Sequence, residues 1–116
     1  MSRRRSRVNE LATIYWRDIP AQVTVTLGGE TFKSLLSPRF QVAIDRAATV
    51  AGLTETSAYV AQWRRESTRL TADVSGEIEA QRRTADIETT YDRDTLERLV
   101  AAGGVVATNE ADAQQT

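Results

Sequence analysis

Apolar and polar side chains alternate strictly along residues 21–27, AQVTVTL, and a period of two is typical of a strand with one buried face. Gly28–Gly29 follows directly and predicts a hairpin turn, because glycine adopts positive φ without a Cβ clash. The β-branched and aromatic run at 13–17 and the segment 30–36 predict two further strands. A break at Ile19–Pro20 separates the first two strands, so the three runs predict a small antiparallel sheet.

The pattern changes to helical spacing at residue 37. Ser37 suits a helix N-cap, Pro38 suits the first helical position, and Gly52 suits the C-terminal stop. A helix is therefore predicted over residues 37–52, with apolar side chains spaced along one face.

A second helix is predicted to begin at Thr54 or Thr56 and to run to residue 70. Four apolar residues fall on one stripe of this segment: Tyr59, Val60, Trp63 and Leu70. The arginines of the segment point away from that stripe, so the helix is expected to pack against the sheet.

Residues 71–102 are rich in charge and sparse in apolar side chains. They predict two short helices with a break near Tyr91–Asp94, and Gly103–Gly104 ends the second one. Because these helices bury little surface alone, we expect them to lie on the domain or on a partner.

The fold class expected from these elements is α+β: a small antiparallel β-sheet of about three strands backed by two helices, plus a C-terminal acidic helical arm. The expected organisation has four parts. They are a basic disordered arm at 1–10, a sheet-plus-two-helix core domain at 11–70, an acidic helical arm at 71–102 and a polar tail at 103–116.

Composition narrows the chemistry. The 116 residues contain no Cys and no His, which excludes disulfides, thiolate nucleophiles, Cys or His zinc sites and Ser-His-Asp catalysis. We therefore expect a protein that is not an enzyme and that binds no cofactor and no metal. No apolar run approaches the roughly 20 residues of a membrane span, and the start of the chain does not resemble a secretory signal. A cytoplasmic protein is expected.

Charge is distributed unevenly, although the net charge is only −1. Residues 1–69 hold 11 Lys and Arg against 6 Asp and Glu, whereas the remainder holds 4 against 10. A basic half and an acidic half can pair internally or present two faces to partners.

Aromatic side chains stand beside arginines at Trp16–Arg17 and Trp63–Arg64, a combination enriched in binding hot spots. Strand alternation predicts that Ile14 and Trp16 face inward, which leaves Tyr15 and Arg17 together on an uncovered face. The two tryptophans are expected in the core. The candidate partner-binding residues are Tyr15, Arg17, Arg64, Arg65, Ile87 and Tyr91.

Four segments carry a family resemblance: TIYWRDIPAQV (13–23), PRFQVAIDRAA (38–48), AGLTETSAYVAQWRR (51–65) and YDRDTLERL (91–99). Together they resemble the bacterial virulence-factor domain, which is also found at one end of the larger protein called conserved virulence factor C. The similarity covers roughly residues 12–101 and keeps the order of the segments.

The resemblance implies an interaction role and no catalytic residue. The larger protein joins this domain to helical repeats and to a segment similar to iron–sulfur scaffold proteins. This chain lacks both, and without Cys it cannot hold a cluster by thiolates. Stand-alone members of the family are encoded near folate and corrinoid one-carbon enzymes, including relatives of methylenetetrahydrofolate reductase, and the resemblance therefore implies an accessory subunit of such a system.

The sequence therefore predicts a non-catalytic accessory or adaptor subunit whose partner is a larger enzyme of one-carbon metabolism. One alternative is a nucleic-acid-binding module that uses Arg39, Arg46, Arg64 and Arg65, although a pI near 5.5 and the acidic arm make nucleic acid an unfavoured partner. The other alternative is a small enzyme with a carboxylate acid-base pair in a closed pocket.

Overall fold

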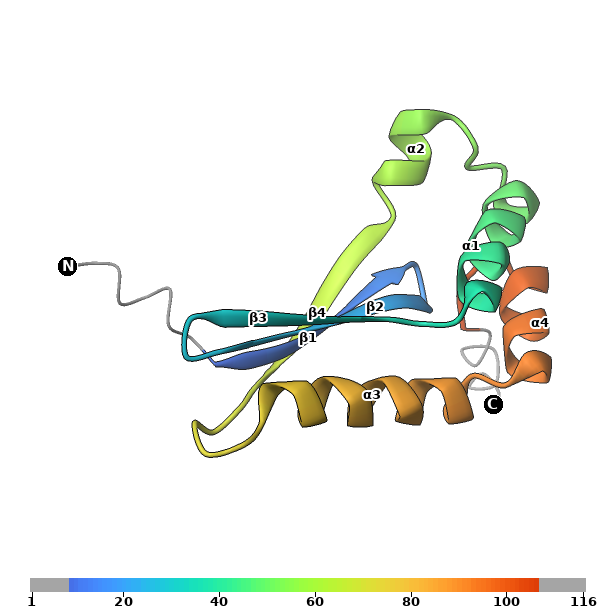
Figure 1. Ribbon diagram of the computed structural model, residues 1–116. Helices are drawn as coiled ribbons and strands as arrows, with labels where there is room; N and C mark the ends of the chain where they lie inside the picture. Colours follow the sequence, from blue (N-terminus) through green and yellow to red (C-terminus); the bar gives the residue numbers. More distant parts are fainter. Residues whose placement is uncertain (1–8, 107–116) are drawn as a thin grey trace, which may run out of the picture.

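Four antiparallel strands form one sheet in the order β3-β2-β1-β4 (Figure 1). A computed structural model describes residues 9–106; most of the expected basic arm and of the polar tail lies outside these residues. The strands are β1 (Glu10–Trp16), β2 (Ile19–Leu27), β3 (Glu30–Leu35) and β4 (Trp63–Arg69). The helices are α1 (Pro38–Ala51), α2 (Thr56–Val60), α3 (Gly76–Thr90) and α4 (Arg93–Ala101).

Several predicted elements are confirmed. The Gly28–Gly29 turn joins β2 to β3, and both glycines have positive φ. Helix α1 begins at Pro38 and ends at Ala51, and the Gly52 that caps it is left-handed with φ 74°. The predicted break between the two acidic helices separates α3 from α4, where the Asp92 side chain caps α4 by accepting a hydrogen bond from the Thr95 backbone N–H.

The turn between β1 and β2 lies at Arg17–Asp18, so the predicted break at Ile19–Pro20 is wrong. Arg17 has a φ of 55°, the left-handed conformation that a two-residue hairpin requires, and Trp16 pairs directly with Ile19. Pro20 stands inside β2 opposite Tyr15, where the register shifts. An irregularity of this kind accommodates a proline, because the proline has no N–H to donate to the ladder.

The predicted second helix is also wrong over most of its length. Only Thr56–Val60 is helical, and residues 63–69 form β4, which pairs with β1 from Trp16↔Trp63 to Glu10↔Arg69. The segment contains Arg and Glu, which favour helices in isolation, but pairing along a whole strand outweighs this local preference. The sheet thus has four strands, not about three.

Helix α3 covers one face of β2 and β3, whereas α1 and α4 pack against each other at one end of the sheet (Figure 1). The buried core joins all of these elements and includes Trp16, Ile19, Val23, Val25, Phe40, Ile44, Ala80, Ile87, Leu96 and Leu99. The helices at 76–101 therefore share the core with the sheet, and the structure does not confirm a separate acidic arm. No helix among residues 9–106 is long and apolar enough to cross a membrane.

Candidate interaction site

The Arg17–Asp18 turn bonds to two other parts of the chain. The Arg17 backbone N–H donates to the Gln62 carbonyl at 3.0 Å, and its guanidinium donates to the Gln62 side chain and to the Gly103 carbonyl, at 3.1 Å each. The Asp18 N–H donates to the Gly104 carbonyl at 2.8 Å. The turn thus fixes both the start of β4 and the segment that follows α4.

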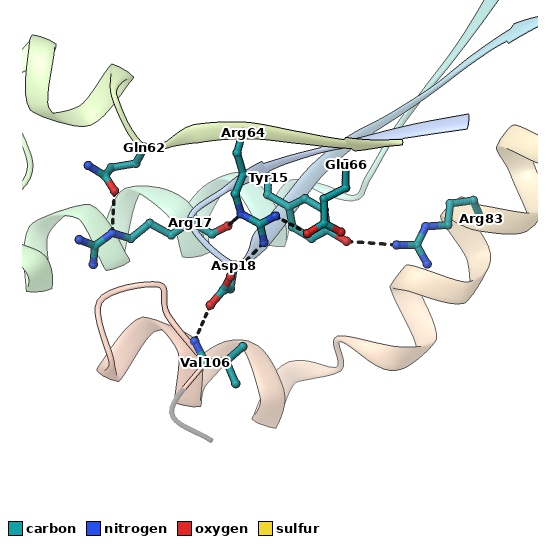
Figure 2. Close-up of polar contacts among 8 residues, drawn as sticks. All are labelled: Tyr15, Arg17, Asp18, Gln62, Arg64, Glu66, Arg83 and Val106. Carbon is teal, nitrogen blue, oxygen red and sulfur yellow. Dashed lines mark hydrogen bonds and ion pairs between the residues drawn. The ribbon is translucent and has the colours of Figure 1, made fainter. Parts of the chain in front are cut away.

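Asp18 and Arg64 form the centre of this cluster (Figure 2). One Asp18 carboxylate oxygen pairs with the Arg64 guanidinium at 3.0 Å, and the other accepts the backbone N–H of Val106 at 2.7 Å. Arg64 also donates to the Arg17 carbonyl at 2.7 Å and pairs with Glu66. Partial burial lowers the pKa of Arg64, but Glu66 and Asp18 outweigh it, so that pKa lies above its ordinary value.

Tyr15 lies between two arginines from different elements. The Arg64 guanidinium stacks on its ring at 4.4 Å from the centroid, and Arg83 of α3 donates to its hydroxyl at 3.2 Å. Arg83 also donates to the hydroxyl of buried Thr13. Because Tyr15 is only 6% exposed, the prediction that it faces solvent is wrong. Its face of the sheet is the one that α3 approaches.

The other predicted contact residues have different surroundings. Arg65 lies on the opposite face of β4, where it is exposed and pairs with Glu10. Ile87 is 1% exposed and belongs to the core, so it offers no surface to a partner in this fold. Tyr91 is half-buried between α3 and α4, and its ring lies edge-on to Phe40 at 6.3 Å. Of the six candidates, Tyr91 is the one that lines an apolar hollow.

That hollow, here named the C-terminal groove, has a volume of about 510 Å³. Its walls come from the end of α3, from α4 and from the segment after α4. It is lined by Thr90, Tyr91, Thr95, Arg98, Leu99, Val105 and Val106. Val105 and Val106 are 40% and 39% exposed, so apolar surface faces solvent there. The residue pattern at 103–106 gave no signal of this groove, because it forms only when the segment returns to the Arg17–Asp18 turn.

The groove and the turn are physically joined. The Val106 N–H that bonds to Asp18 holds one wall of the groove, and Gly104 lies against the Trp16 ring. Burial raises the pKa of the Tyr91 phenol, and the charges of Tyr15, Asp18 and Glu66 raise it further while that of Arg83 lowers it. The raised pKa keeps the phenol neutral at physiological pH, so its hydroxyl is a hydrogen-bond donor and acceptor without charge.

A protein-family model described as Virulence factor matches residues 14–100, which run from β1 to α4 and include the turn and most of the groove. The chain belongs to this family. No curated protein and no solved structure matched the chain. The match confirms the resemblance carried by the four sequence segments.

Within the described part of this virulence factor domain, no group of acidic residues is arranged to hold a metal ion. The two carboxylates nearest each other in the turn cluster, Asp18 and Glu66, both pair with Arg64. An acid-base pair needs one carboxyl that stays protonated in an enclosed site. Here both carboxylates pair with one cation and their side chains are 31% and 60% exposed, so the geometry gives this hypothesis no support.

The arginines of the nucleic-acid hypothesis do not form one surface. Arg39 pairs with Glu88 and Arg46 with Glu97, both beside the C-terminal helices, whereas Arg64 and Arg65 face opposite sides of β4. A nucleic-acid footprint requires a continuous basic stripe. In the virulence factor domain each of these four cations has a carboxylate partner, so the geometry does not favour this function.

Proposed function

We propose that this virulence factor domain is a non-catalytic accessory subunit that docks onto a larger protein through the C-terminal groove. The observation that carries the proposal is the apolar surface left open there, where two valines are about two-fifths exposed beside half-buried Tyr91. Contiguous exposed apolar surface in a small domain is typical of an interaction site.

The bonding of the Arg17–Asp18 turn supports the choice of this groove. Tyr15, Arg17 and Arg64 are engaged inside the chain, so docking through them would require their present contacts to break. The groove needs no such rearrangement. Its rigid support from the turn limits the entropy that a partner must remove on binding.

The partner that the family resemblance suggests is an enzyme of folate or corrinoid one-carbon metabolism, such as a relative of methylenetetrahydrofolate reductase. In this proposal the subunit stabilises or shapes that enzyme and contributes no reacting group. The proposal requires a stable complex of defined stoichiometry.

Co-purification tests the proposal. The tagged chain is expressed at its native level in its own host, and proteins retained at low salt are identified and weighed as an intact complex. We expect one larger enzyme to be retained by the wild type and lost with Val105→Asp, which places a charge in the groove.

Val50→Asp is the matched control, because Val50 is 55% exposed on α1 and does not line the groove. It should retain the partner as the wild type does. Recovery of the wild-type chain alone would contradict the proposal, as would equal retention by the two aspartate variants.

A further inference from the structure

The lining of the C-terminal groove combines an apolar floor with one charge. Leu99, Val105, Val106 and the ring of Tyr91 provide the apolar surface, and the Arg98 guanidinium provides the only charge among the lining residues within 9–106. Each of four other surface hollows in the described chain includes at least one carboxylate. None of the described residues that line the C-terminal groove carries a carboxylate, although the chain as a whole is slightly acidic.

The two arginines of α4, Arg93 and Arg98, differ from those of α1 and α3, which all form ion pairs within residues 9–106. Arg39, Arg82 and Arg83 each pair with a carboxylate. Arg98 has no ion pair among residues 9–106, and its one hydrogen bond runs to the Thr95 hydroxyl at 3.3 Å. Its side chain is exposed beside the valines, so its charge is available to an incoming group.

The polar atoms around the apolar floor are neutral. Thr90 and Thr95 contribute hydroxyls, and the raised pKa keeps the Tyr91 phenol protonated. Hydroxyl groups can donate to a carboxylate that already faces a guanidinium. A cationic group in the same place would meet the Arg98 charge with no carboxylate among the described lining residues.

We propose that the C-terminal groove receives a segment of the partner protein that presents an apolar side chain next to a carboxylate. The apolar side chain lies over Leu99, Val105 and Val106, and the carboxylate pairs with Arg98. This inference rests on the proposed docking function and adds the chemistry of the docked segment. The carboxylate is that of an Asp, a Glu or the partner's C-terminus.

Three small probes with one apolar body test this chemistry without the partner. 4-Phenylbutyrate, 4-phenylbutanol and 4-phenylbutylamine are titrated separately into the ¹⁵N-labelled full chain, and amide shifts are followed at assigned positions. We expect shifts at Thr95, Leu99 and Val106, with the carboxylate binding about two- to fivefold more tightly than the alcohol, as an exposed ion pair allows. The amine should bind most weakly.

A pair of variants on α4 isolates the cation. Arg98→Gln should reduce the affinity for 4-phenylbutyrate to that for the alcohol. Arg93→Gln removes the same charge from the same helix but faces the hollow toward α1, so it should leave the preference unchanged. Equal binding of the three probes, shifts confined to other surfaces, or equal effects of the two variants would overturn the inference. So would groove-dependent dimerisation of the chain in sedimentation, which would make a second copy the occupant.

Co-purification of the complex distinguishes this inference from the proposed accessory function on which it rests. We expect Arg98→Glu to lose the co-purified enzyme and excess 4-phenylbutyrate to release it from the wild type, while 4-phenylbutanol does not. An enzyme that is retained in both cases would overturn the carboxylate chemistry and leave the accessory role standing. Absence of any retained enzyme would overturn the accessory role itself.

Discussion

The Arg17–Asp18 turn and the C-terminal groove are neighbours joined by the hydrogen bond between Val106 and Asp18. Their side chains differ in whether they already have partners within the chain. In the turn, Arg17, Asp18 and the facing Arg64 direct their polar atoms to partners within the chain. In the groove, Arg98 pairs with no carboxylate among the described residues, and apolar surface faces solvent.

The difference shows that residue type alone does not mark a binding surface. Trp, Tyr and Arg are enriched in the hot spots of protein interfaces, but here they make contacts that hold elements of the same chain together. The open surface is made of Val, Leu and Thr beside a single Arg. What separates the two regions is whether each group is already satisfied.

The largest expected effect breaks the contact between the two regions. Gly104 has a φ of 95°, and a Cβ added there would lie 3.0 Å from Trp16, which is fully buried and cannot move aside. Gly104→Ala should lower the free energy of unfolding by about 2–4 kcal/mol, combining backbone strain with overpacking. Urea unfolding followed by tryptophan fluorescence measures this loss.

Gly29→Ala separates strain from packing, because Gly29 also has positive φ but has open space around it. Its cost should be the conformational part alone, about 1–2 kcal/mol. Equal losses for the two alanine variants would mean that the Trp16 contact has no role in holding the segment after α4.

The next effect comes from Asp18→Asn. An amide can accept one hydrogen bond with its oxygen, but its NH₂ group must then face either Arg64 or the Val106 N–H, both of which are donors. We expect a loss of about 1–2 kcal/mol in urea unfolding and weaker probe binding in the groove. Asp45→Asn, at an exposed position of α1, should change stability by less than about 0.5 kcal/mol. A loss at Asp45 as large as that at Asp18 would contradict the account.

Glu88 tests whether a carboxylate bonded within the chain outside the Arg17–Asp18 turn also stabilises the fold. Partial burial raises the pKa of Glu88, but hydrogen bonds from the Ser37 backbone and hydroxyl and from Arg39 outweigh it, so that pKa lies below its ordinary value. A lowered pKa stabilises the fold above the unfolded-state pKa, and this stabilisation is lost as pH falls through the folded-state pKa. Glu88→Gln should cost about 1 kcal/mol at neutral pH, with the difference vanishing in acid. Unfolding curves across pH would contradict this if the difference stayed constant.

The smallest effect on stability is expected for Arg98→Gln. Its side chain is exposed and bonds only to Thr95, so the loss should stay below about 0.5 kcal/mol, a value typical of a cation in the last helical turn. Retention of the partner should nevertheless fall. A loss of stability as large as that of Asp18→Asn would instead make Arg98 a structural residue.

Local patterns predicted much of this fold. The alternation at 21–27, the Gly28–Gly29 turn and the Pro38 start of α1 depend on neighbouring residues and are confirmed. Strand β4 was mistaken for helix because both of its faces carry charged or polar residues, which conceals the period of two. Its conformation is decided by pairing with β1, whose residues lie 47 to 59 positions earlier in the chain.

The candidate site was harder to predict for the same reason. Tyr15 is buried in part because Arg83 of α3 contacts it, and the two residues are 68 positions apart, so no local pattern predicts the contact. The groove requires α4 to end and the chain to return to Asp18, a contact across 88 residues. Tyr91, a predicted contact residue of the acidic arm, lines the groove because it lies at the helix break, where two elements meet.

Hydrogen–deuterium exchange of the chain, alone and in its co-purified complex, tests the central claim most directly. The account predicts slower exchange on binding within residues 95–106, which contain most of the groove lining, and unchanged exchange in the Arg17–Asp18 turn and in β4. Protection confined to the turn or to β4, with the groove unchanged, would contradict it.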